Sequence, residues 1–196
     1  RFATKIAQKA GKNFTPPQIN AFVDKFKAYR DFQTTKKDKF EVVQGEEIRK
    51  WYDEDTYEDQ EYHLDNSCMR YSRCQRYLSI YVENPNQVTM VILKGSDPDK
   101  IIGRALIWKL KDETYYLDRP YANNDEDINL FKEWGRSKGY SVYGADYKHK
   151  EVVLDKAEFS FYPYMDTFKY LNRDEKLLST GANQFDDGDQ NWIRLE

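Results

Sequence analysis

The densest run of chemically capable side chains lies between residues 63 and 76. Arg70, Arg73 and Arg76 recur at every third position, and Tyr71 lies among them. On a helix the three arginines would lie near one face, where guanidinium groups bind phosphate oxygens and a tyrosine ring stacks on a base. This spacing predicts a surface that contacts a ligand or a partner.

The same run has a structural alternative. Residues 51–66 carry seven acidic and no basic side chains, and the arginines would pair with the acidic stretch at 53–61. Cys68 and Cys74 would then be small core residues. The spacing alone does not separate the two interpretations.

Cys68 is also a candidate nucleophile. His63, five residues earlier, would be its base, and Arg70 would lower the pKa of the thiol. The chain has only two cysteines and two histidines, without the paired ligand spacing of a zinc site. We therefore predict no metal, and two reduced thiols are the simplest interpretation of the cysteines.

Asp118 and Asp166 are candidate catalytic residues, because both lie beside prolines and tyrosines at expected strand ends. Two carboxylates that converge on a cleft could act as acid and base or bind a metal ion. The structural alternative pairs Asp118 with Arg119 or Arg104 inside the sheet.

The composition favours a binding surface. The 196 residues are 39% hydrophobic and 33% charged, with 16 Tyr among the aromatics and a net charge of −3. Such a chain can bury a core, and it has no apolar run of 18 residues, so no membrane span is predicted. Tyr, Trp and Arg dominate binding hot spots. The residues that we expect to contact a ligand or partner are Arg70, Tyr71, Arg73, Arg76, Arg119, Tyr162 and Tyr164.

These side chains need elements that position them. Thr15 and Pro16 predict the start of a helix with a buried stripe that includes Phe22 and Phe26. Residues 2–10 are a possible shorter helix, and the acidic stretch 53–61 is expected to be an exposed loop that carries tyrosines. The remaining expected elements are a strand at 40–43, four successive antiparallel strands at 77–82, 88–93, 101–110 and 114–117, a helix at 124–138 and a strand at 140–143.

The predicted fold class is α+β, with a mainly antiparallel mixed sheet flanked by helices. We divide the chain into a basic helical segment that packs on the sheet, an acidic loop, an α+β core and a C-terminal extension. Their ranges are 1–50, 51–66, 67–171 and 172–196. Trp192 and Ile193 are expected to pack back onto the rest.

The hairpin from Val91 to Ala105, with Gly103 in its second strand, is similar to a hairpin of the GNAT acyltransferase fold. The resemblance covers about residues 77–145 and implies a GNAT-like meander. GNAT enzymes bind the pyrophosphate of coenzyme A at a glycine-rich helix N-terminus. The corresponding helix here begins with Asn124, Asp125, Glu126 and Asp127, whose three carboxylates would repel a polyanion. Coenzyme A is therefore disfavoured, and no cofactor is predicted.

Three segments carry a second resemblance: Asn66 to Arg70, Gly103 to Trp108 and Tyr162 to Tyr170. In this combination and order the chain resembles proteins encoded by large tailed bacteriophages. The resemblance implies a viral protein in the cytoplasm of an infected bacterial cell or in the phage particle. It supplies no activity.

The leading prediction is a phage accessory or virion protein that acts as a binding module, without its own catalysis. Its partner would be a host or phage protein. The first alternative is an enzyme on a GNAT-like fold, an acyltransferase or a phosphate-handling enzyme that uses Arg70, Asp118 and Asp166. The second alternative is a nucleic-acid-binding protein. The oligomeric state is left open.

Overall fold

The computed structural model describes residues 14–58, 63–145, 148–161, 163, 165, 167–181 and 191–195. The chain divides into two compact units, residues 1–38 and 39–196. The strand that we expected at 40–43 therefore belongs to the second unit, although we assigned residues 1–50 to a separate helical segment.

The first unit contains helix α2 (Pro16–Thr35), followed by a 3₁₀ turn (Lys36–Lys39). Its start is confirmed, because the backbone N–H of Thr15 donates to Gln18 Oε1 over 2.9 Å. Phe22 and Phe26 stack at 6.3 Å but are 61% and 58% exposed, which differs from the expected buried stripe. Packing of this helix on the sheet stays a prediction, and the possible helix at 2–10 lies outside the described residues.

The second unit is built around a mixed sheet in the order β1-β2-β3-β4-β6, with β5 paired to β3. All of these strands pair antiparallel except β4 and β6, which are parallel. The α+β class and the mainly antiparallel mixed sheet are thereby confirmed. The strands are β1 (Phe40–Val43), β2 (Val88–Lys94), β3 (Ile101–Lys109), β4 (Tyr115–Leu117), β5 (Tyr121–Ala122) and β6 (Ser141–Val142).

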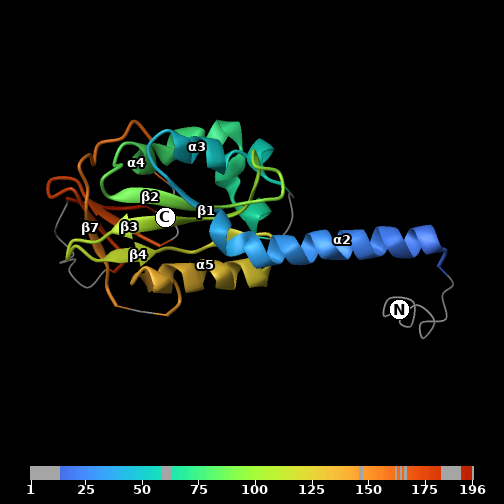
Figure 1. The fold of residues 1–196 in the computed structure, drawn as a ribbon. Helices are drawn as coiled ribbons and strands as arrows, with labels where there is room; N and C mark the ends of the chain where they lie inside the picture. The colour runs from blue at the N-terminus through green and yellow to red at the C-terminus, as the bar shows by residue number, and fades with distance from the viewer. Residues whose placement is uncertain are drawn as a thin grey trace. The chain divides into compact units, whose positions relative to one another are not determined.

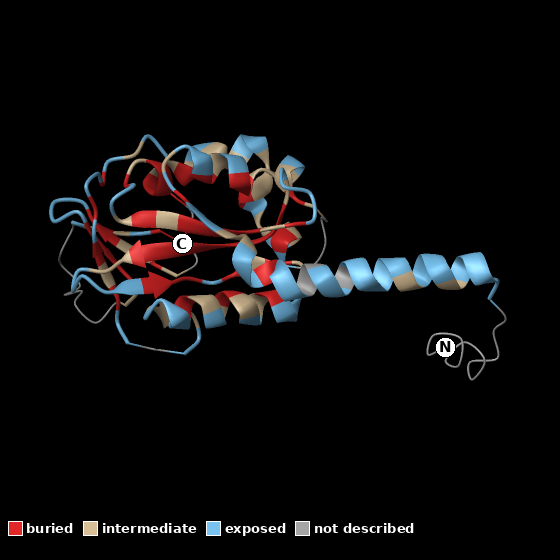
Figure 2. Ribbon diagram, in the orientation of Figure 1, coloured by how far each residue is buried: buried red, intermediate tan, exposed pale blue. Residues whose placement is uncertain are grey.

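Helices cover both faces of this sheet (Figure 1). Helix α5 (Asp125–Ser137) covers one face, and helices α3 (Glu47–Tyr52) and α4 (Ser79–Val82) cover the other. The strands between the two helical layers are buried along most of their length (Figure 2). The α3 side also carries four 3₁₀ segments: Glu54–Thr56, Leu64–Asn66, Cys68–Arg70 and Ser72–Leu78.

The strand expected at 77–82 is wrong. Residues Ser72–Leu78 form a 3₁₀ helix, and Ser79–Val82 continue as α4. Leu78, Tyr81 and Val82 follow helical spacing and are all buried. Packing of this face on β2 outweighs the strand preference of the aromatic and β-branched residues.

The exposed loop expected at 53–61 is also wrong where the structure describes it. Glu54–Thr56 form a 3₁₀ turn, and Tyr52 and Tyr57 are only 8% and 3% exposed. The hydroxyl of Tyr57 donates to the carbonyl oxygen of Tyr52 over 2.7 Å. Of the described acids of this stretch only Asp55 is exposed, while Tyr52 and Tyr57 enter the core.

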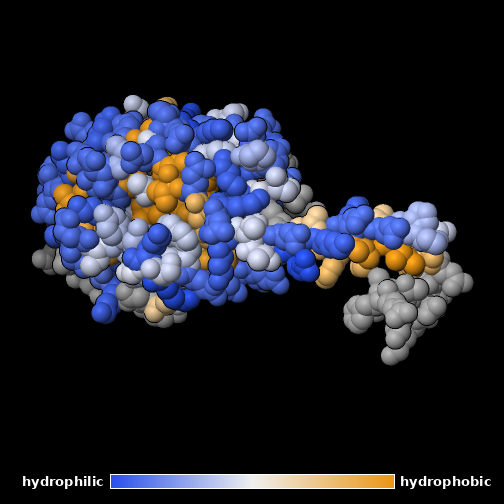
Figure 3. Space-filling view, in the orientation of Figure 1, coloured by the Kyte–Doolittle hydropathy of each residue, from blue (hydrophilic) through white to orange (hydrophobic). Residues whose placement is uncertain are grey.

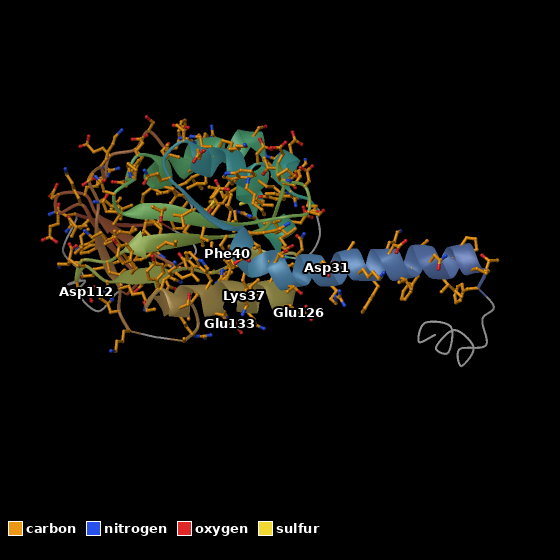
Figure 4. The ribbon with its side chains drawn as sticks, viewed as in Figure 1. Asp31, Lys37, Phe40, Asp112, Glu126 and Glu133 are labelled. Atoms are coloured by element: carbon orange, nitrogen blue, oxygen red, sulfur yellow. The ribbon has the colours of Figure 1, made fainter. Side chains whose placement is uncertain are left out.

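Helix α5 matches the expected boundaries. The Asn124 side chain caps it by accepting from the backbone N–H of Asp127 over 2.9 Å, and Gly139 follows it with φ of 79°. Phe131 is fully buried, and its ring lies 5.0 Å from that of Phe40 on β1. Figure 4 labels Phe40 on β1 and two exposed acids of the helix, Glu126 and Glu133.

A second, smaller antiparallel sheet has the order β10-β8-β9-β7. Strand β10 contains Trp192 and Ile193 and pairs with β8, so the expected return of this segment to the fold is confirmed. The strands are β7 (Glu151–Val153), β8 (Tyr170–Asn172), β9 (Leu177–Ser179) and β10 (Trp192–Arg194).

The viewed surface of the second unit is mostly hydrophilic, with an apolar area over the main sheet (Figure 3). In the part of the chain that the structure describes, no helix combines the length and the apolar character needed to cross a membrane.

Candidate ligand-binding site

The site begins on β3, where alternation sends neighbouring side chains to opposite faces. Gly103 faces α5, and a Cβ at this position would lie 2.7 Å from the Phe131 ring. Arg104 therefore faces the α3 layer, where its guanidinium carbon lies 4.4 Å from the centre of the Tyr52 ring. The glycine lets α5 pack closely on the strand that carries the arginine.

Arg104 is almost completely buried, at 1% exposure. The Tyr57 and Tyr121 rings each lie 5.4 Å from its guanidinium carbon, so three tyrosines surround the cation. Nε and both Nη atoms are buried and have no hydrogen-bond acceptor among the described residues. A buried guanidinium with unpaired donors is costly unless something supplies acceptors.

Tyr52 and Tyr57 stay protonated at neutral pH. Burial raises the pKa of Tyr52 to about 12, although the nearby Arg104 cation acts in the opposite direction. Burial likewise raises the pKa of Tyr57, again against Arg104. Neither phenol therefore supplies a negative charge to the guanidinium.

Asp118, directly after β4, holds three segments together. One carboxylate oxygen accepts from the indole N–H of Trp108 over 3.0 Å, and the other accepts from the backbone N–H of Arg119 over 2.7 Å and from the Thr167 hydroxyl. Burial raises the pKa of Asp118, and these hydrogen bonds lower it by a smaller amount. Asp118 thus accepts from the backbone N–H of Arg119, whereas its structural alternative expected a pair with the Arg119 or Arg104 side chain. Its hydrogen-bond donors are Trp108, Arg119 and Thr167, not the Arg104 guanidinium.

A small cavity opens beside these two residues. We call it the Arg104 cavity; its volume is about 50 Å³. One water needs roughly 10–15 Å³ on such a measure, so the cavity has room for a few waters or one small polar group. Its polar lining comes from Tyr52, Ser67, Arg104, Asp118, Arg119, Tyr121 and Thr167.

A larger, more open groove of about 580 Å³ lies next to the cavity and shares Ser67, Arg119 and Tyr121 with it. Its walls are formed by part of the 3₁₀ layer, which is our name for the four 3₁₀ segments on the α3 side, by the end of β4 and by helix α5. We call this surface the groove. It is lined by His63, Asn66, Ser67, Cys68, Arg119, Pro120, Tyr121, Ile128, Lys132 and Tyr143.

Two predicted regions therefore meet at the groove. Cys68, His63 and Arg119 all line it. Arg119 stacks on the Tyr143 ring at 4.8 Å and donates a hydrogen bond to its hydroxyl. Both cysteines are thiols, as expected.

The predicted arginine face is not a single helical face. The 3₁₀ segments are interrupted at Tyr71, which is extended, so Arg70 is separated from Arg73 and Arg76. Arg70 pairs with Glu54 at 3.1 Å and with Asp65. For Arg70 the structural alternative, pairing with the acidic block, is confirmed.

Arg73 and Arg76 lie on the exposed surface and stack on aromatic rings. Arg73 lies 4.8 Å from the Tyr71 ring, and Arg76 lies 4.6 Å from the Phe161 ring. Neither residue lines the groove or the Arg104 cavity. Their role as partner contacts stays a prediction.

Three further candidates, Tyr162, Tyr164 and Asp166, lie outside the described residues. The described neighbour Thr167 reaches the Arg104 cavity, where its hydroxyl donates to Asp118. Within the described ranges, no three His, Cys, Asp or Glu side chains are grouped as metal ligands would be.

Sequence reasoning did not select Lys132, Tyr121 or Tyr143 as groove residues, and it considered Arg104 only as a partner of Asp118. The available signal for Arg104 was a charged residue inside an apolar strand, next to a glycine. Charged residues are almost never fully buried unless paired, so such a position marks either an ion pair or a site.

No protein-family model, curated protein or solved structure matches this chain.

Proposed function

We propose that this protein is a binding module without its own catalysis and that its partner docks in the groove. The observation that carries the proposal is the lining itself: a concavity of about 580 Å³ with Arg119, Lys132 and tyrosines, and no acidic residue among its described lining residues. The volume lies within the range of roughly 300–1,000 Å³ that is typical of ligand sites.

We propose an acidic segment of a protein as the occupant. Arg119 and Lys132 attract a carboxylate, and the tyrosine rings provide apolar contact area with few rotatable bonds. The resemblance to proteins of large tailed bacteriophages supports a host or phage protein as the source of the segment.

Nucleic acid fits the groove less well. Helix α5, which contributes Ile128 and Lys132 to the lining, begins with Asp125 and Glu126, both exposed. A phosphate backbone carries closely spaced charges along its whole length, so it would meet these acids. Binding to oligonucleotides that weakens steeply with salt would favour the nucleic-acid alternative.

The N-terminus of α5 also argues against the acyltransferase alternative. The backbone N–H of Asp127, one of the groups that would bind a pyrophosphate, already donates to Asn124. A rise in melting temperature with acetyl-CoA would instead support the enzyme on a GNAT-like fold.

Fluorescence anisotropy tests the proposal with labelled decapeptides of equal aromatic content that contain zero, two or four glutamates. We expect affinity to rise with the number of glutamates and to fall about tenfold in the double variant Arg119→Met/Lys132→Met, or about 1.4 kcal/mol. The matched control is Arg136→Met/Lys138→Met, which removes the same charge from the exposed end of α5. Affinity that is independent of glutamate content, or equal in the two double variants, would contradict the proposal.

A further inference from the structure

Arg104 has five N–H donors and nothing among the described residues to accept them. Its three nitrogen atoms are all buried without a hydrogen-bond partner, and the residue is 1% exposed. Leaving a buried donor unpaired destabilises the fold, and more so for a charged group. The buried Arg104 guanidinium therefore lacks, among the described residues, the acceptors that would stabilise it.

The Tyr52 hydroxyl lies close enough to Arg104 to oppose the rise in its own pKa, but no tyrosine oxygen has hydrogen-bond geometry with the buried guanidinium nitrogens. The ring faces of the surrounding tyrosines lie 4.4 to 5.4 Å from the guanidinium carbon, and such contacts stabilise the positive charge through the π-systems. The N–H donors of a guanidinium lie in its plane and need oxygen atoms with lone pairs. The cation–π contacts thus stabilise the positive charge of Arg104, but they provide no acceptors for its N–H groups.

Asp118 does not supply the acceptor either. It lines the same cavity, but its oxygens accept from Trp108, Arg119 and Thr167. These three donors fix the carboxylate in place. With Asp118 engaged by these donors, the space beside the Arg104 guanidinium is the Arg104 cavity, which both residues line.

We propose that the Arg104 cavity is a carboxylate-binding subsite at the inner end of the groove. The two spaces share lining at Ser67, Arg119 and Tyr121, which places the cavity directly beside the groove from which a side chain would enter. A carboxylate matches the paired donors of a guanidinium. The inference deepens the proposed function, because it names the group by which an acidic segment is held.

The surroundings favour a carboxylate over a phosphate. The cavity measures about 50 Å³ and has Asp118 in its lining. A phosphate monoester carries nearly two negative charges at neutral pH, so the carboxylate of Asp118 would repel it more strongly than a singly charged group.

Titration with sodium acetate, followed through the side-chain Nε–Hε resonance of Arg104, tests the subsite. We expect a saturable shift of this resonance that sodium chloride of equal ionic strength does not produce. Arg104→Met assigns the resonance, and Arg104→Gln serves if that variant does not fold. The Arg136 resonance is the internal control, because this residue is exposed on α5, and it should not move.

A titration with inorganic phosphate and the binding of the glutamate peptides complete the test. A saturable shift with inorganic phosphate but not with acetate, or no saturable shift with either, overturns the carboxylate subsite. With the four-glutamate peptide, Arg104→Met should weaken binding about tenfold, while Arg136→Met leaves it unchanged. If acetate binds and the peptides do not, the subsite stands and the acidic protein segment fails; if the peptides bind equally well to Arg104→Met, the groove stands and the subsite fails.

Discussion

Arg70 and Arg104 lie in two regions of the second unit that treat a guanidinium in opposite ways. In the 3₁₀ layer, Arg70 pairs with Glu54 and Asp65. On β3, Arg104 is more deeply buried and has three unpaired nitrogen atoms. In the dense polar run at 63–76, Arg70 stabilises the fold through its ion pairs. In the main sheet, Arg104 is buried without such a partner among the described residues, and we propose that its N–H donors bind a ligand.

A high density of polar residues along the chain is therefore a weak guide to a binding site. Functional sites commonly contain groups that lower stability, whereas structural groups raise it. The two regions should therefore respond to substitution in opposite directions.

Asp118→Ala should destabilise the protein most. The change leaves the indole N–H of Trp108, the backbone N–H of Arg119 and the hydroxyl of Thr167 without their acceptor, at about 2–4 kcal/mol in total. Urea unfolding measures the loss. Asp112→Ala is the control, because Asp112 accepts two hydrogen bonds from Thr114 at an exposed hairpin tip, labelled in Figure 4. An equal loss in the two variants would show that Asp118 does not join the segments around the cavity.

Arg70→Met should cost about 1–2 kcal/mol, because Glu54 and Asp65 would lose the cation between them. Its matched control is Arg73→Met, which removes the same charge from an exposed position in the next 3₁₀ segment. We expect a much smaller change there in the midpoint of urea unfolding. Similar midpoints for both variants would show that Arg70 does not stabilise the fold more than Arg73 does.

Arg104→Met should change the free energy of unfolding by less than about 1 kcal/mol or increase it, because replacing a buried charge by an apolar group of similar volume is often neutral or stabilising. Urea unfolding without added carboxylates measures this effect. A loss as large as that in Arg70→Met would mean that Arg104 is itself a structural residue.

The smallest expected effect is a change in pH dependence. Burial raises the pKa of Asp118 from its ordinary value of 3.8, so the folded protein keeps this proton to higher pH than the unfolded chain. The resulting stabilisation is complete below 3.8 and is lost as pH rises through the folded pKa. In Asp118→Asn this residue does not titrate, so the stability of the wild type relative to the variant should fall as pH rises from 3.8. A relative stability that rises over this range would contradict the raised pKa.

Much of the fold was predictable because local signals agreed with the tertiary structure. The capping residues of α2 and α5, the strand at Phe40–Val43 and the hairpin of β3 with β4 all combine a periodic pattern with a recognisable start or turn. The segment 77–82 failed because its apolar residues suit either a strand or one face of a helix, and only its packing on β2 decides between them.

The site was predictable only in part. Cys68 was selected in the dense polar run at 63–76, and Asp118 at an expected strand end beside Arg119. The structure places all three at the groove or the cavity. Arg104 and Tyr121 come together through the register of β3 with β5, and Lys132 reaches the groove from helix α5. Such contacts between distant segments depend on strand register and helix packing, which no local pattern encodes.

The central claim is that Arg104 is retained for binding and Arg70 for stability. Urea unfolding of the wild type and Arg104→Met, each in sodium chloride and in sodium acetate at equal ionic strength, tests it most directly. We predict that the variant is at least as stable as the wild type in chloride and that acetate stabilises only the wild type. Equal effects of acetate on both proteins, together with a loss of stability in the variant in chloride, would contradict the claim.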